Sequence, residues 1–309
     1  MGQSTIRKPW SYYLYDLAAL LFNERVLNAA LRKTIPIFLL IPPMRQNIQA
    51  NMRRVFFHTH KREPRDEELA ALLKEMEPLF AQRIINSYAL PKNPEGYLKN
   101  SELEFVPALQ DLLKEGRGAI LATPHFGDDG MIYGSLACLG IPVTVMVNEA
   151  RGYQWASEIN KNLHFIGLGE GAMKGLKALR NNETLLLYDD MNYFPESRLT
   201  NFFGAPFPPP HGIARMALTA PAPILPVYSI FESGRCRILN DEPIRSRPDA
   251  SQEELERQLL LSMERFIGRY PAHWLIFHPM WDLAACRKAW SRQLSGIVFH
   301  NRMDTPRRS

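Results

Sequence analysis

The chain has 309 residues, of which 46% are hydrophobic and 22% charged, and this balance is typical of a folded globular protein and excludes a disordered one. A net charge of +5 favours anionic partners such as a membrane surface; because no nucleic-acid motif accompanies it, we expect neither DNA nor RNA. The three cysteines are far apart and form no CxxC pair, which argues against a disulfide framework and a structural zinc site.

The first hundred residues are predicted to be mostly helical. Apolar patches at 12–22 and 35–44 are too short, or too interrupted by proline, to cross a bilayer. Basic residues flank them, which fits an element lying at an anionic membrane surface, and a helical hairpin packed on its own domain explains them equally well. Three acidic residues at 66–68, followed by apolar residues at helical spacing, predict a helix that ends before the polar segment 91–100.

From residue 101 the pattern alternates between helix and strand. A helix is expected over roughly 101–115, and a long amphipathic helix over 252–270. Short apolar runs predict buried strands at 119–122, 142–147, 185–188 and 224–230. The alternation predicts an α/β fold with a mainly parallel central sheet flanked by helices. We therefore expect three regions: a helical membrane-associated region (1–100), an α/β core (101–285) and a basic C-terminal tail (286–309).

One predicted strand end carries the parts of an acid–base site, in the segment AILATPHFGDDG at 119–130. Ligand sites in open α/β sheets lie at the carboxyl ends of strands. His125 can take a proton from an alcohol there, and a carboxylate from Asp129 or Asp128 can fix its tautomer. The plain alternative is a histidine at a helix start with two solvated N-cap aspartates, and spacing alone favours that alternative.

Several motifs, in order, resemble the lipid A late acyltransferases. In that family a strand is followed by a histidine, four further residues, and a glutamate or aspartate. The basic "RxxIxxN" helix and the acidic helix after it are similar at 45–88. Residues 185–217 are similar to the family's strand, acidic turn, "FFG" and "GxARxA" helix. The segment YPAHWLIFHPMW at 270–281 is similar to the family's closing segment. The resemblance covers most of residues 45–282.

The resemblance implies an acyltransferase without cofactor or metal. It implies transfer of a fatty acyl group from acyl carrier protein or coenzyme A to a hydroxyl of a lipid or lipid-linked sugar resembling lipid A, with His125 as general base. The donor, the lipid acceptor and a membrane surface are then the partners. The implied location is the cytoplasmic face of the inner membrane, and no signal peptide is visible.

The sequence also departs from the family pattern. The family's catalytic carboxylate falls at Gly130, so Asp129 or Asp128 would have to replace it, although one residue on a helix turns a side chain by about 100°. Pro279 and Met280 replace a closing pair of arginines. Four residues are candidates for substrate binding: Arg151, Asp189, Asp190 and Arg215. A solvated turn explains the two aspartates about as well, and a packed helix explains Arg215.

Two alternatives to fatty acyl transfer stay open. The same fold could carry an aminoacyl group, such as glycyl, or another non-fatty acyl group. A different class is a non-catalytic module that binds a carrier protein or membrane, inactivated by the change at Gly130. His273 and His278 lie among aromatic residues and are expected to be hydrogen-bonded core residues rather than ligands.

Overall fold

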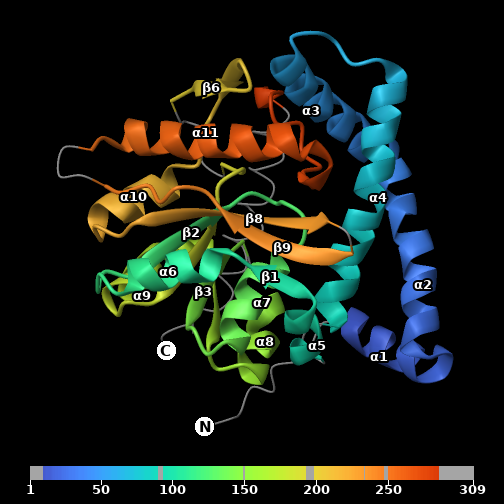
Figure 1. Cartoon of the computed structure of the whole chain (residues 1–309), viewed down its shortest axis with the longest axis horizontal. Coiled ribbons are helices and arrows are strands. Elements are labelled where there is room, and N and C mark those ends of the chain that lie inside the picture. The colour runs from blue at the N-terminus through green and yellow to red at the C-terminus, as the bar shows by residue number, and fades with distance from the viewer. Residues whose placement is uncertain are drawn as a thin grey trace, which may run out of the picture.

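A seven-stranded sheet forms the centre of the molecule (Figure 1), in the order β1-β9-β8-β2-β5-β3-β4. The computed structural model describes residues 10–89, 93–148, 150–192, 198–232, 234–246 and 250–284. The strands are β1 (Ser101–Leu103), β2 (Ala119–Thr123), β3 (Val143–Val147), β4 (Leu163–Gly167), β5 (Thr184–Tyr188), β8 (Ile224–Glu232) and β9 (Arg235–Asn240). Every neighbouring pair is parallel except β8 and β9. The predicted α/β class with a mainly parallel sheet is confirmed.

Side chains alternate along each strand, so each strand contributes to both faces of the sheet. Both faces are buried by helices. In β2, Ala119 and Leu121 pack into a core with α6 and α7, whereas Ile120 and Ala122 pack into a second core with α9, α10 and α11. These helices are α6 (Phe105–Leu113), α7 (Gly130–Cys138), α9 (Leu168–Arg180), α10 (His211–Thr219) and α11 (Gln252–Arg269). The remaining short elements are α5 (Pro94–Lys99), η2 (Ala150–Tyr153), α8 (Gln154–Ile159), η3 (Pro271–His273) and the hairpin β6 (Thr200–Phe202) with β7 (Ala205–Phe207).

The N-terminal helices stand along one side of this core (Figure 1). They are α1 (Trp10–Phe22), α2 (Glu24–Thr34), η1 (Ile35–Leu40), α3 (Pro42–His60) and α4 (Asp66–Ala89), which agrees with the predicted helical region. Ile48 and Met52 of α3 and Met76 of α4 share one buried cluster with Trp274 from the end of the described chain. The two helices therefore belong to the same hydrophobic core as the α/β part.

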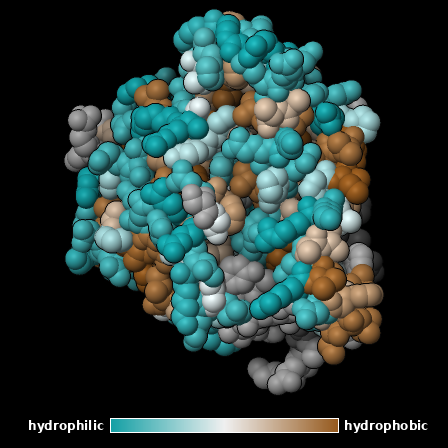
Figure 2. Space-filling view, turned by 45° about the vertical axis from the view of Figure 1, so that its right-hand side comes forward, coloured by the Kyte–Doolittle hydropathy of each residue, from teal (hydrophilic) through white to brown (hydrophobic). Residues whose placement is uncertain are grey.

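Several apolar side chains on the N-terminal helices face outward. They are Tyr13, Leu14, Leu17, Leu20, Leu21 and Phe22 on α1, and Ile37, Phe38, Leu40 and Ile41 at η1. Brown surface gathers on the right-hand side of Figure 2, where these helices come forward. Among the described residues no single helix is long and apolar enough to span a bilayer, and only the bent pair 25–40 and 42–60, at 82°, passes that test together.

Two secondary-structure predictions need correction. The helix expected over 101–115 begins with the strand β1, because Ser101, Glu102 and Leu103 pair in parallel with β9, and the helix α6 starts at Phe105. Strands β4 and β9 were not predicted, since the apolar residues in each alternate with polar or charged ones; β4 is an edge strand and β9 lies next to the edge strand β1. The predicted tail at 286–309 lies outside the described residues.

Candidate active site

The register between β2 and β5 creates the centre of the site. Thr123 at the end of β2 lies opposite Tyr188 at the end of β5. His125 follows β2 and Asp190 follows β5, each two residues after this pair. Oδ1 of Asp190 lies 2.8 Å from Nδ1 of His125, and Oδ2 accepts a hydrogen bond from the backbone N–H of His125 at 2.8 Å. The indole N–H of Trp274 also donates to Oδ2, at 3.1 Å. The histidine and its carboxylate are thus held by two adjacent parallel strands.

The loop that carries His125 needs a glycine at position 127. The φ of Gly127 is 57°, and a Cβ there would stand 2.0 Å from the carbonyl oxygen of Ser229 on β8. The Gly127 N–H donates to the carbonyl of His273 at 2.7 Å, and the Leu275 N–H donates to the carbonyl of His125 at 2.8 Å. Residues 273–275 therefore hold the loop that carries His125 through two backbone hydrogen bonds.

Asp190 is a charged partner suited to an imidazolium. Burial alone would raise its pKa, but the charge of His125 and hydrogen bonds from His125 and Trp274 lower that pKa below its usual range. The ring of His125 also stacks on Tyr188, with centroids 4.5 Å apart. Because an ionised carboxylate only accepts hydrogen bonds, Nδ1 of His125 carries a proton, so in the neutral ring Nε2 is the nitrogen with the free lone pair.

The predicted pairing of His125 with Asp129 or Asp128 is not what the structure shows. Asp129 is buried and forms an ion pair with Arg83 of α4 at 2.9 Å, while Asp128 accepts a hydrogen bond from Asn86 of the same helix. Burial raises the pKa of Asp128 to about 7, with a further contribution from the charge of Asp129. The aspartates follow the histidine closely in sequence but turn with the start of α7 toward α4.

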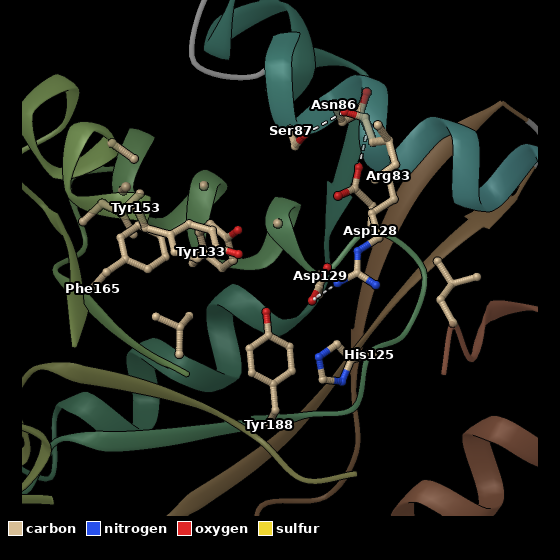
Figure 3. A pocket seen from close by; sticks show the side chains of 18 of the residues that line it. Arg83, Asn86, Ser87, His125, Asp128, Asp129, Tyr133, Tyr153, Phe165 and Tyr188 are labelled. Carbon is tan, nitrogen blue, oxygen red and sulfur yellow. Dashed lines mark hydrogen bonds and ion pairs between the residues drawn. The ribbon is translucent and has the colours of Figure 1, made fainter. Parts of the chain in front are cut away.

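These residues surround a cavity of about 770 Å³, a size usual for small-molecule sites. One side is polar, with His125, Asp128, Asp129, Arg83 and Asn86 (Figure 3). The other side is mainly apolar and is formed by α7, α8 and β4, with Gly134, Ala137, Cys138, Trp155, Ala156, Leu163 and Phe165. Tyr133 and Tyr153 both make ring contacts with Phe165 on this second side. The cavity can therefore receive a molecule with a reactive polar end and an apolar tail.

Two of the other predicted substrate-binding residues, Arg215 and Asp189, do not line the cavity. Arg215 of α10 is exposed, does not line the cavity, and donates to Gln252 at 3.3 Å. Asp189 is buried, and neither of its carboxyl oxygens has a hydrogen-bond partner in the described part of the chain. Burial and the neighbouring Asp190 raise the pKa of Asp189 well above its usual value, so the acid is held neutral. The side chain of Arg151 lies outside what the structure describes.

Sequence reasoning placed Asp190 at a strand end but did not pair it with His125, and it missed Arg83 and Asn86. The signal for Asp190 was available, since the carboxyl ends of parallel strands meet at one sheet edge. The α4 residues gave no such signal, because their contact with α7 depends on tertiary packing alone. No group of three or more His, Cys, Asp or Glu side chains suited to a metal occurs among the described residues.

The fold and this site define an α/β protein with a histidine–carboxylate pair over a partly apolar cavity. The chain belongs to the bacterial lipid A biosynthesis acyltransferase family, whose model matches residues 16–282. The recognition made from the motifs is thereby confirmed, and so is the acyltransferase class at the level of the family.

Individual relatives are more distant. The chain is 27% identical over 192 residues to phosphatidylinositol mannoside acyltransferase of Mycobacterium tuberculosis, in the two strains CDC 1551 and H37Rv. That match covers 59% of this chain and 60% of the relative, which is less than two thirds of the relative's length. The crystal structure of 1-acyl-sn-glycerophosphate acyltransferase from Thermotoga maritima is similar with a TM-score of 0.39 and 15% identity, covering 79% of this chain and 99% of the other.

Proposed function

We propose that this protein transfers an acyl group from a thioester, on acyl carrier protein or coenzyme A, to a hydroxyl of a lipid or lipid-linked sugar. The observation that carries the proposal is the His125–Asp190 pair facing a cavity that is polar at one side and apolar at the other. Membership of the acyltransferase family supports it. A lipid A-like acceptor is the particular form that the family description favours.

His125 acts as the general base in this mechanism. Asp190 accepts a hydrogen bond from the Nδ1–H of His125, so Nε2 takes the proton of the acceptor hydroxyl as its oxygen attacks the thioester carbonyl. The resulting imidazolium is stabilised by the buried carboxylate. The C–O bond forms, the C–S bond breaks, and the proton passes from His125 to the leaving thiolate. No covalent acyl-enzyme is needed.

The apolar side of the cavity receives the acyl chain. Its walls from α7, α8 and β4 offer hydrocarbon and aromatic surface. Burying an acyl chain there contributes a favourable free energy of about 25 cal/mol for each Å² of apolar surface removed from water. The polar side, next to His125, then holds the thioester and the acceptor hydroxyl. This orientation puts the reacting carbonyl beside the base.

The exposed apolar residues of α1 and η1 are proposed to lie in a membrane interface, at the cytoplasmic face of the inner membrane. A lipid acceptor is found there, and outward-facing apolar side chains next to basic residues suit an anionic surface. Replacing Leu20 and Leu21 by Glu should lower binding to vesicles of phosphatidylethanolamine and phosphatidylglycerol. Met173→Glu, at an equally exposed position on α9, is the matched control, and equal binding by both variants would refute the proposal.

The activity is tested with radiolabelled acyl thioesters. The purified protein in mild detergent receives fatty acyl carrier protein or fatty acyl coenzyme A, with total membrane lipid as acceptor. Label should enter lipid with the unmodified protein, and His125→Ala should abolish the transfer, whereas His164→Ala, at an exposed histidine on β4, should not. If only a glycyl thioester supports transfer, the proposed donor is an aminoacyl group and not a fatty acyl group. Well-folded protein that transfers nothing would overturn the proposal.

A further inference from the structure

A second imidazole faces the cavity beside His125. His278 lines the cavity, and its ring makes no hydrogen bond or ion pair within the described residues. The sequence predicted a hydrogen-bonded core residue. That prediction is met by His273, whose Nε2 accepts from the Phe231 N–H at 3.0 Å, but not by His278. The ring is half-buried, and a cavity-lining imidazole without a partner among the described residues is available to a ligand.

The backbone of His278 is fixed by two asparagines of α3. Asn51 donates to the carbonyl of His278 at 2.7 Å and accepts from the N–H of Met280 at 3.1 Å, and Asn47 donates to the carbonyl of Phe277 at 3.0 Å. Asn51 is buried. Asn51, the last residue of the "RxxIxxN" motif, therefore has a structural role, because it fixes the backbone of the segment that carries His278.

The ring of His278 is uncharged at neutral pH. Burial lowers its pKa, and the neighbouring His125 lowers that pKa further. A neutral imidazole still carries one N–H donor. His278 thus adds a hydrogen-bond donor to the cavity without adding a second positive charge next to the base.

Acyl transfer needs such a donor. When the hydroxyl attacks, the thioester carbonyl oxygen becomes negatively charged, and a preorganised donor near it lowers the barrier. Two other donors at this side of the cavity already have acceptors, since Arg83 is paired with Asp129 and Asn86 donates to Asp128. His278 is free to serve the carbonyl oxygen.

We propose that His278 is a second catalytic residue, which donates its N–H to the carbonyl oxygen of the thioester while His125 takes the proton of the acceptor. The proposal rests on the proposed acyl transfer. The hydroxyl oxygen bonds to the carbonyl carbon, the C–S bond breaks, and the proton moves through His125 to the thiolate. His278 keeps its own proton throughout. Asn51 is a positioning residue that acts through the His278 backbone.

The test compares two replacements of similar size in the radiolabel assay. His278→Leu removes the donor and should lower kcat by about 100- to 1,000-fold, with a much smaller change in KM, because the donor acts on the charge that develops in the transition state. His278→Asn keeps an N–H donor and should retain at least tenfold more kcat than His278→Leu. His60→Leu, at an exposed histidine on α3, is the control that should keep full activity.

Three outcomes overturn the assignment. The first is a folded His278→Leu variant that keeps more than half of the original kcat. The second is equal loss in His278→Leu and His278→Asn, which a purely packing role would give. Should His278→Leu fail to fold by circular dichroism, His278→Ala against His278→Asn decides in the same way. The third is an unmodified protein that transfers no acyl group at all, which removes the proposed function as well and is recognised before any variant is compared.

Discussion

Two pairs of neighbouring aspartates lie near His125, and they have different partners. Asp189 and Asp190 follow β5, and Asp190 is bound to His125 through both its oxygens. Asp128 and Asp129 follow the histidine in sequence, yet both side chains are bound to α4. A carboxylate 65 residues away is therefore the partner, while one four residues away is not. Strand register, rather than distance along the chain, selects the residue that orients the histidine.

The largest expected effect comes from the carboxylate on the sheet side. Asp190→Asn should lower kcat by about 1,000- to 10,000-fold, because an amide no longer enforces the tautomer with Nδ1 protonated or stabilises the imidazolium. Asp129→Asn should lower kcat far less. The radiolabel transfer assay measures both. A greater loss in Asp129→Asn would indicate that Asp129, rather than Asp190, orients His125.

The pair on the helix side should matter most for stability. Arg83→Met leaves the buried carboxylate of Asp129 without its cation, and breaking a buried pair in this way costs about 3–5 kcal/mol. Arg53→Met removes an exposed ion pair with Asp66 and should cost less than about 1 kcal/mol. Urea unfolding compares the two variants. Equal free energies of unfolding would show that Arg83 and Asp129 are not a buried pair in solution.

Asp189 predicts a dependence of stability on pH. Its pKa is raised in the folded protein, so the unfolded chain loses this proton first, and stability falls as the pH rises above the ordinary pKa. Asp189→Asn should therefore be more stable than the unmodified protein at pH 8 and nearly equal to it at pH 3.5. A difference of the same size at both pH values, measured by thermal unfolding, would contradict a neutral buried acid.

The smallest expected effect concerns the position where the family carries its carboxylate. A side chain at Gly130 has room, since the nearest atoms to its Cβ are the Asp128 carboxylate and the Tyr133 hydroxyl, both at 3.4 Å. Gly130→Asp should change kcat by less than about threefold and should not rescue Asp190→Asn, because Nδ1 of His125 already faces β5. Full rescue would indicate a second usable geometry. Gly127→Asp is the contrasting glycine change and should prevent folding.

Much of the fold could be predicted because its signals are local. The strands that carry His125 and Asp190 are short apolar runs, and the helix of α4 has acidic residues at its start and one apolar face. The order of strands is not a local property. Only the placement of β2 beside β5 brings the two residues together, and apolar periodicity contains no information about which buried strands are neighbours.

The same reason explains what was missed on the other side of the site. Arg83 and Asn86 lie on a helix whose pattern gives its buried face but not the element that it packs against. Likewise, the role of Asn51 depends on a contact with a residue 227 positions away. The family motifs identified these segments as important without showing which atoms they bring together.

The most direct test of the central claim observes the imidazole itself. Protein labelled with ¹⁵N-histidine should show an Nδ1–H proton resonance from His125 far downfield, assigned by its loss in His125→Gln. The structure predicts that this resonance persists in Asp129→Asn and is lost or strongly shifted in Asp190→Asn. A resonance that persists in Asp190→Asn and disappears in Asp129→Asn would contradict the account.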